Sequence, residues 1–227
     1  MKTPAYHKSL ETLHVNCLEP RAYFIPFADE KTAASRERSE SDYFVPLCGE
    51  WDFRFFKSFE DVLREPPEYV GESGFDKISI PRSWQTYTDR GYDVPLYSNL
   101  EYPFPTDPPF VPDENPCGLY VRKFTLDKKL FSRDLFLNFE GVDSCFYVWL
   151  NGKFVGFSEV SHCMSEFDVT DFAVSGENTL CVLVVKWCPG TYLEDQDCFR
   201  FSGIFREVYL LARGKETVSY THLPAHE

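Results

Sequence analysis

Residues 146–157 read FYVWLNGKFVGF, two apolar runs joined by Asn151-Gly152. Asn and Gly both tolerate the positive φ angles of a two-residue type I′ turn, whose twist matches that of the strands it joins. The flanking runs are rich in the aromatic and β-branched residues that favour strands. The stretch therefore predicts an antiparallel hairpin with strands over 146–150 and 153–157.

Further strands are expected on both sides of this hairpin. Trp51, Phe53 and Phe55 recur at every second position, which predicts a strand that buries one face. The run 179–187 is almost entirely apolar, as expected for a strand covered on both faces. Strands at this spacing, without a sustained helical period, predict an all-β fold, an antiparallel β-sandwich with jelly-roll topology. The other predicted strands are 77–80, 119–126, 135–139, 167–169 and 207–211, with a turn at 175–178.

Two segments do not follow the strand pattern. Residues 1–45 are irregular and include a highly charged stretch, so we expect an N-terminal arm that lies over the rest of the chain. Residues 82–117 contain seven prolines, which exclude a helix or a central strand because each proline fixes φ and restricts the residue before it. Such a long loop is more often functional than passive. The expected organisation is the arm, a sandwich at 46–213 and a tail at 214–227.

The composition excludes several classes of partner. The chain has 227 residues, of which 43% are hydrophobic and 26% charged, the balance of a folded protein with a core. Its 23 Lys and Arg against 36 Asp and Glu give a net charge of −13, which repels phosphate backbones and anionic lipids. No apolar run approaches the ~18 residues of a membrane span, and no secretory leader is visible. We therefore expect no nucleic-acid or membrane partner and a cytoplasmic location.

The chain is rich in cysteine and also contains His and Trp side chains that could bind a metal ion or stack on a sugar. The cysteines lack a Cys-x-x-Cys pair, so we expect reduced thiols that are buried or half-buried instead of a disulfide framework or a zinc site. His162 beside Cys163 lacks further ligands at a suitable spacing and is expected on a surface loop. Trp149 and Trp187 lie in predicted strands and are expected in the core. For Trp84 two roles remain open, packing in the core and stacking against a sugar. The eight cysteines are at positions 17, 48, 117, 145, 163, 181, 188 and 198.

Several longer motifs resemble one protein family. In order and spacing, over about residues 10–213, they resemble the N-terminal sugar-binding domain of glycoside hydrolase family 2 β-galactosidases. The resemblance implies a jelly roll of the galactose-binding-domain type. The motifs are PLYSNLEYPF at 95–104, DPPFVPDENPCG at 107–118, FEGVDS at 139–144, VWLNG at 148–152, YLEDQD at 192–197, SGIFR at 202–206 and, in the arm, PRAYFIPF at 20–27.

The resemblance also implies a function for the complete protein, the hydrolysis of terminal β-D-galactose residues such as that of lactose. Retaining glycosidases use two carboxyl groups ~5 to 5.5 Å apart. In this family both are glutamates on a (β/α)₈ barrel, which takes ~250 residues. The chain ends before such a barrel could begin, so we expect no catalytic residue within it and no hydrolytic activity from it alone.

By motif position, the resemblance assigns Asn99 and Asp197 to substrate binding. It implies that both side chains reach the galactose pocket of the barrel, and that Asp197 is also a ligand of a monovalent cation, commonly sodium. The complete enzyme is further expected to use magnesium and to form a homo-oligomer. The family commonly has Met and Trp where Cys198 and Phe199 stand, a departure that bears on the shape of the pocket.

Other interpretations stay open at this point. Asn99 in its proline-flanked loop also suits an Asx turn, and Glu194, Asp195 and Asp197 also suit a solvated acidic loop or ion pairs with nearby arginines. The sandwich could equally be a free-standing carbohydrate-binding module, or a structural domain that holds an oligomer through its arm and Pro-rich loop. Residues 216–227 resemble translated sequencing-adapter DNA and are expected to pack on nothing, with a natural linker as the alternative.

Overall fold

The hairpin at Asn151-Gly152 forms as predicted. In the computed structural model, β9 (Cys145–Leu150) pairs antiparallel with β10 (Lys153–Ser158). Asn151 and Gly152 have φ values of 53° and 75°, the left-handed conformation that a type I′ turn requires. Asn151 Oδ1 also accepts a hydrogen bond of 2.9 Å from the Thr179 backbone, which ties the turn to the next strand of the sheet. Local sequence and a tertiary contact therefore fix this hairpin together.

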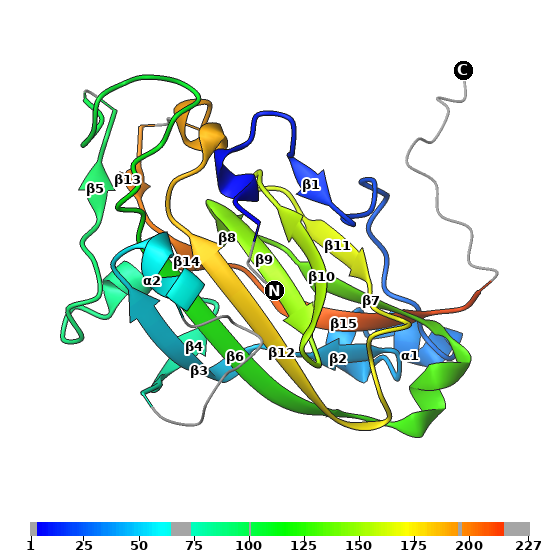
Figure 1. The fold of residues 1–227 in the computed structure, drawn as a ribbon. Helices are drawn as coiled ribbons and strands as arrows, with labels where there is room; N and C mark the ends of the chain where they lie inside the picture. The colour runs from blue at the N-terminus through cyan, green and yellow to red at the C-terminus, as the bar shows by residue number, and fades with distance from the viewer. Residues whose placement is uncertain (1–3, 65–73, 100, 195–196, 216–227) are drawn as a thin grey trace, which may run out of the picture.

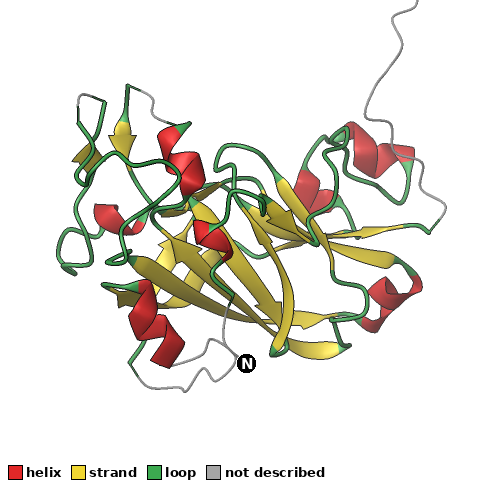
Figure 2. Cartoon of the chain, turned by 45° about the horizontal axis from the view of Figure 1, so that its top comes forward, coloured by secondary structure: helices red, strands yellow, loops and turns green. Residues whose placement is uncertain are grey.

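Two antiparallel sheets make up the sandwich (Figure 1, Figure 2). Within residues 4–64, 74–99, 101–194 and 197–215, which the structure describes, one sheet has seven strands in the order β1-β10-β9-β12-β6-β3-β4 and the other has four in the order β11-β7-β15-β2. This confirms the predicted all-β sandwich. Beside β9 and β10, the strands are β1 (His14–Val15), β2 (Phe44–Pro46), β3 (Gly49–Phe56), β4 (Asp76–Ile80), β6 (Cys117–Leu126), β7 (Asp134–Phe139), β11 (Ser165–Asp168), β12 (Gly176–Val185) and β15 (Val208–Arg213).

Smaller elements decorate the sandwich. Two short ladders lie outside the main sheets, and the arm contains brief helices where the sequence predicts irregular structure. The ladders join β5 (Leu96–Tyr97) to β13 (Phe199–Arg200) and β8 (Val142–Asp143) to β14 (Gly203–Ile204). The helices are α1 (Glu30–Ala34) and α2 (Phe59–Arg64), with 3₁₀ turns η1 (Tyr6–Lys8), η2 (Arg38–Glu40), η3 (Trp84–Thr86), η4 (Lys128–Ser132) and η5 (Pro189–Tyr192).

Strand β12 is buried on both faces, as its apolar sequence predicts. Leu180, Val182 and Val184 belong to the core between the two sheets. Cys181 and Leu183, which alternate with them, belong to a second cluster on the outer face of the seven-stranded sheet. Because side chains alternate across a strand, one strand supplies both layers. The strand begins at Gly176, so the prediction of a turn over 175–178 is wrong. The Asn178 side chain forms two hydrogen bonds with the Val174 backbone, and these bonds hold the chain just before the strand.

The outer face is covered by elements that the sequence pattern does not predict. Helix α2 places Phe59 on it, and the arm adds His7, whose ring lies 4.1 Å from that of Phe59. His7 is fully buried, and its backbone N–H donates to Tyr147 Oη at 3.1 Å. Burial and the neighbouring Lys8 lower the pKa of His7 to about 3. Phe55 is half-buried and packs on the same core as Trp51 and Phe53, as predicted, whereas Phe56 packs in the second layer on the opposite face.

A buried charged cluster holds the arm on the four-stranded sheet. Glu166 of β11 accepts hydrogen bonds from Arg21 Nη2 at 2.6 Å and from Arg213 Nη2 at 2.9 Å. The side chains of all three residues are 10% exposed or less. Arg21 belongs to the arm and Arg213 to β15, so one carboxylate joins three segments. Arm residues His14–Val15 also add an edge strand to β10. The arm lies over the sandwich as expected, but it is anchored there by specific contacts.

Candidate functional site

The ladder between β5 and β13 brings together the two residues to which the resemblance assigns substrate binding. Tyr97 pairs with Phe199 and Leu96 with Arg200, so the Pro-rich loop lies beside the segment that follows η5. Asn99 comes two residues after Tyr97, and Asp197 comes two residues before Phe199. The ladder therefore places their side chains in contact although 98 positions separate them in the sequence.

Three side chains form this polar cluster. Asn99 Nδ2 lies 3.4 Å from Asp197 Oδ1 and 3.3 Å from Tyr97 Oη. The Tyr97 hydroxyl also donates to Asp197 Oδ1. All three side chains are exposed, so they present an amide, a carboxylate and a phenol at one surface. These groups donate to and accept from hydroxyl groups, which is the chemistry needed to bind a sugar.

Tyr97 is the member of this cluster that the sequence analysis missed. Its motif contains Tyr97 and Asn99 at i and i+2, and side chains at this spacing share one side of an extended chain. That spacing is a signal that could have identified it. The Tyr97 ring also packs edge-on against Phe199, with a distance of 5.8 Å between ring centroids and an angle of 61° between the ring planes. Tyr97 thus joins the polar cluster to the apolar surface beside it.

Buried polar residues support the ladder from behind. Arg200 is 6% exposed, and its guanidinium donates to Ser98 Oγ at 3.1 Å and to the Thr191 carbonyl at 2.8 Å. These bonds join β13 to the loop of β5 and to η5. Arg200 therefore positions the strands that carry the polar cluster.

A small hollow next to the ladder is lined by Phe199 and Arg200 together with Asp143, Ser161 and Glu194. Its volume is about 150 Å³. Burial is the main reason why the pKa of Asp143 rises to about 6, and the nearby Glu194 carboxylate adds to the rise. Glu194 accepts hydrogen bonds of 2.9 Å from the Ser161 backbone and hydroxyl. Glu194 is thus held by Ser161 and is not part of a freely solvated acidic loop.

The described residues do not form a complete metal centre. No group of three or more His, Cys, Asp or Glu side chains gathers in the part of the chain that the structure describes. Asp197 presents a carboxylate at the exposed cluster. Asn99 directs its amide nitrogen toward this carboxylate, and an amide nitrogen is a hydrogen-bond donor and not a metal ligand. Asp197 can therefore supply one oxygen to a cation whose other ligands come from elsewhere.

The remaining sequence predictions have mixed outcomes. Trp149 and Trp187 are buried as expected, and Trp84 is fully buried, with its indole N–H 3.4 Å from Asp93. His162 is exposed in a turn. All eight cysteines are free, but Cys163 and Cys198 are exposed, so the expectation of burial is wrong for these two. Both lie in loops, whereas the buried Cys117, Cys145 and Cys181 lie in strands. The predicted tail at 216–227, Asp195 and Leu100 lie outside the described residues.

No helix among the described residues has both the length and the apolar character needed to cross a membrane.

Comparisons with known proteins define the class of this domain. Residues 44–214 match the family model described as the sugar binding domain of glycosyl hydrolases family 2. The chain belongs to this family.

Its relatives give a more particular picture. Over 213 residues it is 50% identical to a β-galactosidase of Actinobacillus pleuropneumoniae, and over 223 residues it is 45% identical to one of Staphylococcus xylosus. These matches cover 94% of this chain, but 20% and 21% of the relatives. The chain thus spans about a fifth of the length of these curated relatives.

A similar fold occurs in solved glucuronidases. A β-glucuronidase from an uncultured Clostridium species matches with a TM-score of 0.58 and 21% identity, covering 86% of this chain and 31% of that one. The β-glucuronidase of Bacteroides uniformis matches with a TM-score of 0.55 and 21% identity, and the match covers 75% of this chain and 18% of that one. At these identities the likeness concerns the fold alone.

Proposed function

We propose that this chain is the sugar-binding domain of a β-galactosidase and that Asn99 and Asp197 contact the hydroxyl groups of the substrate galactose. The observation that carries the proposal is the convergence of these two residues, from segments 98 positions apart, on one exposed polar cluster. The catalytic carboxyl groups belong to another domain of the complete protein. This domain then contributes to substrate binding and supports the catalytic domain, without performing the chemistry.

The charge of the cluster favours a galactoside over a glucuronide. Asp197 is a carboxylate on an exposed surface, and the chain carries a net charge of −13. A glucuronide presents its own carboxylate at C6, and two like charges in one site repel each other. Galactose has a neutral hydroxyl at C6, and this hydroxyl can donate a hydrogen bond to the Asp197 carboxylate. The 50% and 45% identities to β-galactosidases support the same substrate.

A monovalent cation such as sodium fits Asp197 as one ligand. A hard cation prefers oxygen ligands, and a carboxylate at the sugar site would hold it beside a substrate hydroxyl. The remaining ligands would come from the catalytic domain and the substrate. Magnesium, expected for the complete enzyme, is not assigned to any described residue of this chain.

The test uses a chimera in which residues 1–213 replace the matching segment of the Actinobacillus pleuropneumoniae β-galactosidase. Asp197→Asn keeps the size of the side chain and removes its charge, and Asp89→Asn in an exposed turn is the matched control. Loss of a charged hydrogen bond to a substrate hydroxyl lowers kcat/KM for a nitrophenyl β-galactoside by about 10- to 150-fold. Asn99→Ala is expected to lower it by about fivefold or more.

The controls give each result a clear meaning. Asp89→Asn should leave kcat/KM unchanged. Activation by sodium should be present in the parent chimera and absent from Asp197→Asn. The substrate proposal would be refuted by a parent chimera that prefers the glucuronide, and the site proposal by Asp197→Asn and Asn99→Ala variants with unchanged kcat/KM. Millimolar or tighter binding of galactose to the isolated chain would instead support a free-standing binding module.

A further inference from the structure

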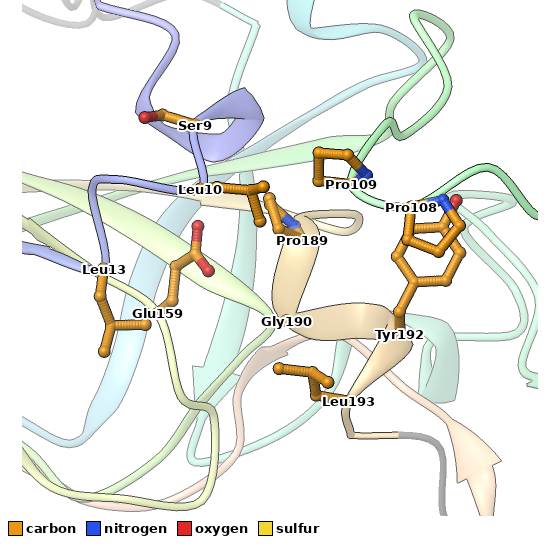
Figure 3. Close-up of a pocket in the computed structure, with 10 residues that line it drawn as sticks. All are labelled: Ser9, Leu10, Leu13, Pro108, Pro109, Glu159, Pro189, Gly190, Tyr192 and Leu193. Carbon is orange, nitrogen blue, oxygen red and sulfur yellow. The ribbon is translucent and has the colours of Figure 1, made fainter.

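A second, separate pocket lies between the arm, the Pro-rich loop and η5. Its volume is about 290 Å³, near the lower end of the range of about 300–1,000 Å³ that is usual for small-molecule sites. As Figure 3 shows, its walls come from the arm, the Pro-rich loop, η5 with the residue after it, and Glu159, four parts of the chain that lie far apart in the sequence. Most of the lining is apolar, supplied by Leu10, Leu13, Pro108, Pro109, Pro189 and Leu193.

One carboxyl group interrupts this apolar lining. Glu159 follows directly on β10, and the residue is 4% exposed. Its Oε1 atom is buried without a hydrogen-bond partner. In Figure 3 the side chain extends from its strand toward Leu10. A buried carboxyl oxygen without a partner is costly, so this geometry calls for a donor that the described residues do not supply.

The groups that face Glu159 do not neutralise it. The Gly190 backbone and the Cys188 thiol act to lower the pKa of Glu159, and the negative charge of Glu194 acts to raise it. Burial dominates, and it raises the pKa of Glu159 to about 7. The Glu159 backbone N–H donates to the Leu13 carbonyl at 3.1 Å, which holds the arm against the pocket.

We propose that this pocket binds a small organic ammonium ion, a primary amine on a compact apolar body. The ammonium group would donate to Glu159 Oε1, and the apolar body would lie against the leucine and proline walls. Glu159 is itself 4% exposed, and a charged hydrogen bond to a buried carboxyl group is stronger than one between exposed groups. This site is distinct from the polar cluster at Asn99 and Asp197, and the proposal does not depend on the proposed function.

Other ligand classes fit the pocket less well. Calcium and magnesium take six or more oxygen ligands, and the lining supplies three oxygen-bearing side chains, those of Ser9, Glu159 and Tyr192. Zinc prefers His and Cys ligands, which the lining does not contain. A sugar would place its hydroxyl groups against leucine and proline, which leaves them unbonded. A neutral hydrocarbon would leave Glu159 unpaired. An anion would be repelled by Glu159 and by the net charge of −13.

The test measures binding of benzylammonium to the full 227-residue chain by NMR titration, with benzyl alcohol as a neutral probe of nearly equal shape. Benzylammonium should bind saturably and about tenfold or more tightly than the alcohol. Glu159→Gln should remove this difference, whereas Glu177→Gln, an exposed glutamate outside the pocket, should preserve it. Galactose should not compete with benzylammonium.

A second variant keeps the test decisive if Glu159→Gln perturbs folding. Leu193 is 89% exposed, so Leu193→Ser removes part of the pocket wall with little effect on the core. It should weaken benzylammonium binding by about threefold or more, because apolar contact area is lost. Equal affinities for the two probes, the absence of saturable binding, or unchanged binding in both variants would overturn the proposal.

Discussion

Replacement of Glu159 by Gln should make the domain more stable at neutral and alkaline pH. Burial raises the pKa of Glu159 from 4.5 to about 7, so the folded state holds this proton more tightly than the unfolded state does. The stability linked to the proton is complete below pH 4.5 and is lost as the pH rises through about 7. The full loss corresponds to about 3 kcal/mol. Gln resembles the protonated acid and does not titrate, so the variant avoids this loss.

The measurement is urea unfolding of the parent and of Glu159→Gln, followed by tryptophan fluorescence. From about pH 5.5 to about pH 8.5, the free energy of unfolding of the variant should rise relative to the parent by about 2 kcal/mol. Glu177→Gln is the control, because this glutamate is exposed, and its difference from the parent should not vary with pH. Parallel curves for the parent and Glu159→Gln across the whole range would refute the reasoning.

Three further substitutions test the fold and the polar cluster. Gly156→Ala would place a Cβ 2.4 Å from the Val15 carbonyl oxygen, so urea unfolding should show a loss of about 2 to 3 kcal/mol, and a neutral effect would contradict this packing. Glu166→Gln removes the charge that faces two buried arginines and should lower the free energy of unfolding by about 3 kcal/mol in the same assay. A loss below about 1 kcal/mol would contradict the role of this charged cluster. In the chimera, Tyr97→Phe removes the hydroxyl that holds Asp197 and should lower kcat/KM about tenfold while urea unfolding stays unchanged; full activity would argue against positioning by Tyr97.

The strands were predictable because their signals are local. The Asn151-Gly152 turn follows from the backbone freedom of two residues, and the alternation of Trp51 and Phe53 follows from the period of a strand. Neither of these two predictions requires knowledge of which segment lies beside the strand. The apolar run that became β12 predicts burial on both faces for the same reason, and the structure confirms this.

The second apolar layer was not predictable in the same way. It depends on which distant segment covers the outer face of the seven-stranded sheet. His7 belongs to an arm that reads as polar and irregular, yet it packs on Phe59 and bonds to Tyr147. A single sequence does not reveal that partner, because the partner is chosen by the path of the whole chain. The same limit explains why the burial of Phe56 in this second layer was not predicted.

The two sites differ in how far the sequence leads to them. Asn99 and Asp197 could be named through motifs that resemble a family, and their contact then follows from the register of the β5–β13 ladder. Glu159 carries no such motif, and a glutamate at the end of a strand is expected in solvent. It is buried because the arm and η5 converge on it from opposite ends of the chain. A buried carboxyl oxygen without a partner is thus a property of the assembled fold, and the structure is needed to find it.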